Sequence, residues 1–153
     1  MAANLNAAYV SKLCDPMPAT AEPGVAVYKL PSGPAGATLM GGVAVTATIK
    51  VTGNYPELVG RLWDVSPSGT RQIVALGVVR PNVNQRAGTK PTAKGAQTLS
   101  FELDPNNYAF APGDTVELEL AGSTAPLFRK SNGTFTVTVT HLVAKVPTET
   151  APG

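Results

Sequence analysis

Cysteine, histidine and charge are all scarce in this chain of 153 residues. The single cysteine, Cys14, excludes a disulfide within the chain, and with only one histidine present an ordinary zinc site is excluded as well. Charged residues make up 14% of the sequence, and 12 Lys and Arg against 10 Asp and Glu leave a net charge of +2. Such a small and scattered excess gives no reason to expect a nucleic acid or an anionic membrane as partner.

Long apolar runs and helical periodicity are also missing. No stretch reaches the roughly 18 apolar residues of a membrane-spanning helix, and the first residues lack the basic and apolar segments of a signal peptide. The threonine-rich composition, the low charge and the lone cysteine fit a secreted bacterial protein, so we expect an extracellular or secreted location.

What the sequence does contain favours an all-β domain. Glycine occurs 15 times, proline 14 times, and valine and threonine 17 times each, whereas isoleucine occurs twice. β-Branched residues fit a pleated sheet, and frequent proline and glycine forbid long helices. A hydrophobic share of 43% predicts a packed core rather than disorder.

Alternating patterns place the strands. Residues 43–51 alternate apolar and polar side chains over nine positions, which predicts a half-buried strand. Residues 58–65 and 71–79 flank the turn sequence at 66–69 and predict a hairpin. Further strands are expected at 25–30, 98–103, 115–121 and 134–146, with a short extended piece at 108–110.

Two strands carry more detailed predictions. In 115–121, the pattern points Val116, Leu118 and Leu120 inward and Glu117 and Glu119 outward. In 134–146, the apolar positions change parity at Thr140 and His141. Because a shift of one residue turns every later side chain to the other face, we expect a β-bulge there.

Seven to nine strands with frequent turns predict a single β-sandwich, either immunoglobulin-like or a jelly roll. We expect residues 1–24 to form an extended lead-in or linker, 25–147 the sandwich, and 148–153 a flexible tail. The long polar loop at 81–96 carries Arg86, Lys90 and Lys94, and loops of this length are often functional.

Catalytic chemistry finds little support. The sequence contains no Gly-x-Ser-x-Gly nucleophile elbow. The one histidine, His141, lies within a predicted strand, and no carboxylate flanks it to orient it as a base. No catalytic, cofactor-binding or metal-binding residue is predicted.

Two kinds of ligand site are weaker alternatives. Asp64, Asp104 and Asp114 lie at strand ends, where carboxylates can bind Ca²⁺, but acidic residues at turns usually bond backbone N–H groups. Five aromatic residues are candidates for stacking on sugars: Trp63, Tyr9, Tyr28, Tyr55 and Tyr108. Trp63 lies in the middle of a strand and is expected to be buried, which leaves Tyr55 and Tyr108, near turns, as the better sugar contacts.

Three segments resemble one protein family. RLWDVSPSG at 61–69 followed by QIVALGVVRP at 72–81 is similar to the motif R-L-x-D-V-x-P-D-G … L-x-x-G-x-x-R. That motif belongs to the non-catalytic C-terminal domain of X-prolyl dipeptidyl peptidases and cocaine-esterase-like hydrolases. Residues 101–128 and 131–147 resemble later parts of that domain, although Ser68 stands where the family often has Asp and Asp114 where it often has His or Arg.

The resemblance implies a jelly-roll β-sandwich with a galactose-binding-like fold that packs against an α/β-hydrolase domain carrying the catalytic serine. The chain alone would then not be an enzyme. Two alternatives stay open: an independent module that binds carbohydrate or a cell-surface polymer, and a structural sandwich that pairs through its edge strands. An exposed apolar face would favour the accessory domain, and two exposed aromatic side chains in a groove would favour the carbohydrate module.

Overall fold

The structure, a computed structural model, describes residues 15–30, 36–81, 96–124 and 127–149. These residues form strands and no helix, so no helix long and apolar enough to cross a membrane is found among them. The strands are β1 (Met17–Pro18), β2 (Ala26–Leu30), β3 (Ala37–Gly41), β4 (Ala44–Gly53), β5 (Leu58–Val65), β6 (Thr70–Val79), β7 (Ala96–Glu102), β8 (Asn106–Phe110), β9 (Thr115–Ala121), β10 (Phe135–Lys145) and β11 (Thr148–Glu149). Residues 82–95 of the predicted long loop, with Arg86, Lys90 and Lys94, lie outside the described residues, as do Tyr9 and Cys14.

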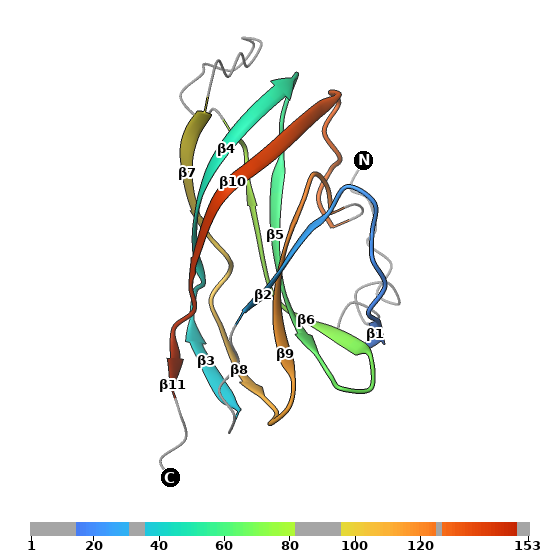
Figure 1. Ribbon diagram of the computed structural model, residues 1–153, viewed down its shortest axis with the longest axis vertical. Helices are drawn as coiled ribbons and strands as arrows, with labels where there is room; N and C mark the ends of the chain where they lie inside the picture. The colour runs from blue at the N-terminus through green and yellow to red at the C-terminus, as the bar shows by residue number, and fades with distance from the viewer. Residues whose placement is uncertain (1–14, 31–35, 82–95, 125–126, 150–153) are drawn as a thin grey trace, which may run out of the picture.

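The strands form two layers, which confirms the predicted all-β sandwich (Figure 1). One layer is a five-stranded antiparallel sheet in the order β1-β6-β5-β9-β2. The other consists of two three-stranded sheets, β10-β4-β7 and β11-β3-β8, that follow one another end to end. The strand pairs β3/β4, β7/β8 and β10/β11 are consecutive in the sequence, so the second layer is a single sheet broken across its middle.

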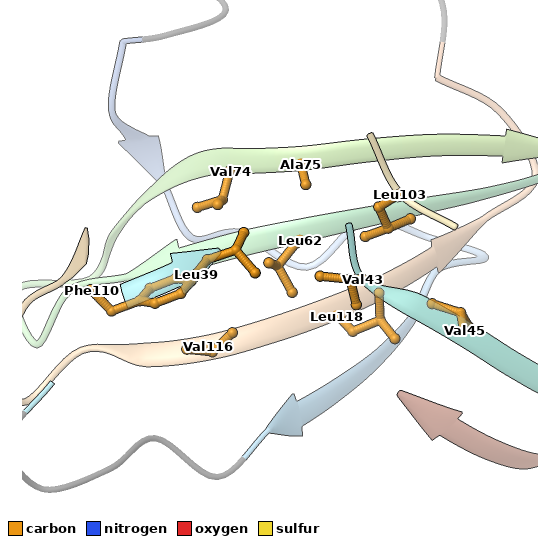
Figure 2. Packing of buried hydrophobic residues seen from close by; sticks show 10 residues of the cluster. All are labelled: Leu39, Val43, Val45, Leu62, Val74, Ala75, Leu103, Phe110, Val116 and Leu118. Carbon is orange, nitrogen blue, oxygen red and sulfur yellow. The ribbon is translucent and has the colours of Figure 1, made fainter. Parts of the chain in front are cut away.

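The core lies between the layers. Alternate residues of β4 are buried as predicted, with Val45, Ala47, Ile49 and Val51 all at most 4% exposed. Figure 2 shows how Leu39, Val43, Leu62, Leu103 and Leu118 and their neighbours converge from both layers. A second cluster around Ile49, Leu58 and Leu120 continues the core along the sandwich. These apolar contacts hold the two layers together without a disulfide among the described residues.

The bulge predicted in the last long strand is confirmed. The pairing of β10 with β4 shifts its register between Val139 and His141, and Leu142 then packs inward as Val137 and Val139 do. A second register shift, between Leu62 and Trp63 in the β5–β6 pair, was not predicted. Both irregularities keep apolar side chains on the core face of a twisted strand.

The sheets extend beyond the limits expected for the sandwich. Met17 and Pro18 pair with Thr70 and Arg71 at the edge of the five-stranded sheet. At the other end of the chain, β11 pairs with β3. The sequence did not predict the β3 strand, because its short apolar pattern, ATLMG, lies between glycine-rich segments.

A pair of glycines lets the chain cross closely over the five-stranded sheet. Gly60 of β5 and Gly77 of β6 face each other. A Cβ on Gly77 would lie 2.6 Å from the Glu102 carbonyl oxygen and 2.9 Å from the Leu103 Cα. The Asp104 N–H also donates to the Leu76 carbonyl at 2.8 Å, which fixes the crossing. Gly77 is the glycine of the L-x-x-G-x-x-R motif, and its role is to permit this contact.

We expect Gly77→Ala to lower the free energy of unfolding by about 1–3 kcal/mol, because the added methyl group meets backbone atoms that cannot move independently. Gly60→Ala is the matched control, since its Cβ would meet the end of the Leu103 side chain, at 2.6 Å, rather than backbone. Urea unfolding followed by circular dichroism measures both. A larger loss for Gly60→Ala than for Gly77→Ala would contradict the proposed crossing.

Candidate functional site: a charged cluster under the N-terminal strap

The segment before the first core strand is fastened across the outer face of the five-stranded sheet. We call residues 15–24 the N-terminal strap. Its β1 residues pair with β6, and the Ala19 N–H donates to the Gly69 carbonyl at 2.9 Å. Further along, Glu22 reaches two arginines that project from the sheet. The described part of the expected lead-in is therefore an integral part of the sandwich.

Beneath the strap, four charged side chains form what we call the charged cluster: Glu22, Arg61, Arg71 and Glu119. Glu119 Oε2 lies 3.0 Å from Arg61 Nε, and its Oε1 lies 2.6 Å from Arg71 Nη1. Glu22 contacts the other ends of the same guanidinium groups, at 3.0 Å in both cases. Each arginine thus lies between two carboxylates, which compensates charges that are largely removed from water.

Trp63 completes the charged cluster. Its ring lies against the Arg71 guanidinium, 4.2 Å from the ring centroid, with Arg61 at 5.8 Å. Its indole N–H donates to Glu119 Oε2. The prediction that Trp63 is buried is confirmed, since the side chain is 3% exposed. It packs under charged groups on the outer face, not within the two apolar clusters, and no open surface remains on which a sugar could stack.

The prediction for Glu119 was wrong. The alternation correctly turned this side chain away from the core, but it is 1% exposed because the other face of the sheet is covered at this point. Arg61, Trp63 and Glu119 lie on the same face of neighbouring strands, with Arg61 directly opposite Glu119. That opposite-charge pair across β5 and β9 was the signal that pattern reading missed, because strand pairing was unknown.

The negative charge of Glu22 stabilises the attachment of the strap to the sheet. Burial raises the pKa of the Glu22 carboxyl, but the hydrogen bonds and charges of Arg61 and Arg71 outweigh this effect and hold the pKa below its ordinary value. Because the pKa is lowered in the folded state, the contribution of Glu22 is present at neutral pH and is lost as the pH falls through the folded pKa. At neutral pH the strap is therefore fastened by a charged carboxylate.

A second group of polar side chains lies at the end of β5 and brings together two of the calcium candidates. Asp64 Oδ2 accepts a hydrogen bond from the Tyr108 hydroxyl at 2.7 Å, while its Oδ1 is buried without a partner. Burial, together with the neighbouring Asp114 carboxyl, raises the pKa of Asp64 despite the Tyr108 hydrogen bond. The described residues contain no group of three His, Cys, Asp or Glu side chains that could hold a metal ion.

We expect Asp64→Asn to raise the free energy of unfolding relative to that of the natural chain. This difference should grow as the pH rises from about 4 to 7. The folded pKa of Asp64 is raised, so its favourable protonated form is present at low pH and is lost as the pH rises through that pKa. An asparagine keeps an acceptor for Tyr108 and an N–H donor for Asp114 at every pH. Urea unfolding at both pH values measures the difference, and a difference independent of pH would contradict this reading.

The other sequence candidates are dispersed. Asp114 accepts from the Ala111 N–H at 3.0 Å, the usual role of an aspartate in a turn, and Asp104 is exposed in the turn after β7. His141 is exposed at the bulge of β10. Tyr28 packs between the apolar clusters, Tyr108 points its hydroxyl at Asp64, and Tyr55 is 48% exposed. Of the tyrosines in the described ranges, only Tyr55 offers an open ring.

The fold is shared with hydrolases of known structure. The chain superimposes with a TM-score of 0.70 and 18% identity on an α-amino acid ester hydrolase, covering 84% of this chain and 26% of that one. For an aminopeptidase from a marine sediment archaeon, Thaumarchaeota archaeon, the TM-score is 0.69, the identity 13% and the coverage 85% and 26%. For a CocE/NonD family hydrolase from Staphylococcus aureus, these values are 0.60, 14%, 80% and 30%. Comparison with curated proteins gives no match.

The sandwich is thus of a kind that forms about a quarter to a third of the length of these hydrolases. The sequence profile of the X-Pro dipeptidyl-peptidase C-terminal non-catalytic domain matches residues 5–149. This chain belongs to that family, which confirms the resemblance seen in the sequence. As a member of a non-catalytic domain family, the chain alone is not a catalytic unit.

Proposed function

We propose that this chain is the accessory domain of a larger serine hydrolase, of the X-Pro dipeptidyl peptidase or esterase class, and that it packs against the α/β-hydrolase domain of that protein. The observation that carries the proposal is the family match over residues 5–149, in a chain that spans only 26–30% of the hydrolases it resembles in structure. Its task would be to brace the catalytic domain and to help wall the entrance to the active site.

The strap gives this role a physical basis. An accessory domain can brace its neighbour only if the chain that enters it is held in one position. Here β1, the Ala19 hydrogen bond and the two Glu22 ion pairs fix the strap to the sheet at three places. Glu22 contacts arginines that are themselves held by the buried Glu119, so the position of the strap is tied to the centre of the sheet.

The large hydrophobic side chains exposed on the described surface do not form the apolar face that was expected of an accessory domain, and this counts against that role. These side chains lie on separate strands and connections: Val27, Met40, Tyr55, Val78, Phe128 and Val143. Contacts between domains of one chain are commonly more polar than those of obligate dimers, so this distribution is compatible with docking. The alternative, an independent carbohydrate module, was expected to stack sugars on two open aromatic rings in a groove, and only Tyr55 supplies one among the candidate tyrosines, so stacking alone does not support it.

The isolated chain is expected to hydrolyse neither X-Pro dipeptide amides nor aryl esters above background. Acyl transfer needs an activated nucleophile, a base within about 3 Å of it and donors for the oxyanion. Ser66 and Ser68 bond to each other and to Thr70 within their turn, and His141 lies on β10 instead. Chromogenic substrates and a fluorophosphonate probe make the measurement. Stoichiometric labelling of a serine, abolished by His141→Ala, would overturn the proposal.

A further inference from the structure

A polar cleft of about 520 Å³ opens at one end of the sandwich, away from the charged cluster. It lies where the connections β4–β5 and β9–β10 meet the end of β6, at the upper end of the molecule in Figure 1. Three cationic side chains line it, Arg80, Arg129 and Lys130, together with the carboxyl group of Glu57 and the ring of Tyr55. The proposed accessory role uses none of these residues, although Arg80 is the arginine of the L-x-x-G-x-x-R motif.

Tyr55 is held in a conformation that its side chain disfavours. Its φ is +54°, and no other non-glycine residue in the described ranges has a positive φ. The Ser131 hydroxyl donates to the Tyr55 carbonyl at 2.5 Å, and the Gly133 N–H donates to the same hydroxyl at 3.1 Å. Asparagine or glycine would adopt this backbone more readily. A strained residue that is fixed by its surroundings and keeps an open ring is typical of binding sites.

Glu57 brings an acceptor that the protein itself does not satisfy. Its Oε1 is buried and has no hydrogen-bond partner. Burial raises the pKa of Glu57, and the charge of Arg80 opposes this rise. Because Glu57 also lines the cleft, its carboxyl group is an acceptor for a ligand that brings a hydroxyl or N–H group.

We propose that this cleft binds an acidic sugar, a uronic acid unit of a polysaccharide. The apolar face of the sugar ring stacks on Tyr55, its carboxylate pairs with Arg129 and Lys130, and a hydroxyl donates to Glu57. A simple inorganic anion would use the cations but neither the ring nor the Glu57 carboxyl group. A neutral sugar would leave the cations unpaired. A uronic acid is at once anionic, ring-shaped and hydroxylated and therefore uses all of these groups, and this inference is independent of the proposed accessory role.

The test uses the 153-residue chain and isothermal titration calorimetry with two acidic probes, tetragalacturonate and a hyaluronan tetrasaccharide. We expect at least one to bind. We expect the methyl ester of tetragalacturonate, which has the same rings without the charge, to bind at least tenfold more weakly. Equal binding of acid and ester would overturn the proposal, and so would binding of neither acidic probe. Equally tight binding of inorganic phosphate or of a tetra-aspartate peptide would show a general anion site and would also overturn it.

Variants locate the site. Tyr55→Asn removes the ring but suits the positive φ, so it should fold at least as well as the natural chain and bind at least tenfold more weakly. Tyr55→Phe keeps the ring and should bind within about threefold of the natural chain. Arg129→Gln should weaken binding at least fivefold, whereas Lys29→Gln, an equal charge change on β2 outside the cleft, should not. Binding that survives Tyr55→Asn, or that falls equally in Lys29→Gln, would contradict the proposal.

Discussion

Glu119→Ala is expected to lower the free energy of unfolding by about 3–5 kcal/mol, since removing one partner of a buried ion pair leaves the other charge uncompensated. The Glu119 side chain is 2% exposed and holds both Arg61 and Arg71, whose side chains are 10% and 5% exposed. Its loss also leaves the Trp63 indole N–H without its acceptor. Urea unfolding followed by circular dichroism gives the difference.

Glu117→Ala is the matched control on the same strand and the same sheet face. Glu117 pairs only loosely with Lys29, at 3.8 Å, and the lysine side chain is 76% exposed. The Glu117 side chain is itself 14% exposed, but so long an ion pair with an exposed lysine contributes about 0–1 kcal/mol, so the loss should stay within that range. Equal losses for the two variants would show that Glu119 does not organise the charged cluster.

Trp63→Ala is expected to cost about 3–5 kcal/mol, the usual range for a large buried aromatic side chain. The substitution removes the ring that lies against Arg71 and the donor to Glu119. Trp63→Phe keeps a smaller ring and loses the donor, so we expect a smaller cost, of about 1–2 kcal/mol. Circular dichroism is the measurement for both, because Trp63 is the only tryptophan in the chain.

The same tryptophan reports on its own surroundings in the natural chain. Its fluorescence emission should lie to the blue of free tryptophan in water and should shift to the red on unfolding, because the side chain is buried. Emission at the position of the free amino acid would contradict the structure of the charged cluster.

Most of the sandwich could be predicted from the sequence because a strand with one buried face shows its period directly. The alternation in 43–51 and the turn at 66–69 gave β4 and the β5–β6 hairpin nearly to the residue. The parity change at Thr140 and His141 gave the bulge, since a register shift is visible in the order of side chains.

What the sequence did not reveal depends on contacts between distant residues. Glu22 is 97 positions from Glu119 in the sequence, yet both carboxylates contact the same two arginines. No local sequence pattern indicates that these side chains come together. The cleft likewise combines residues from three connections, and among them only Tyr55 was predicted as a ligand contact. The conformation of Tyr55 depends on Ser131, which is 76 positions away, so propensity alone could not predict it.

The central claim is that this domain serves a serine hydrolase whose nucleophile lies outside these residues. The most direct test labels the natural proteome of the source organism with a biotinylated fluorophosphonate, enriches the labelled proteins and identifies them by mass spectrometry. The account predicts peptides of this domain in a labelled polypeptide larger than 15.7 kDa, with the label on a serine outside the present sequence. Detection of the domain only as an unlabelled 15.7 kDa protein, or with the label on one of its own serines, would contradict the account.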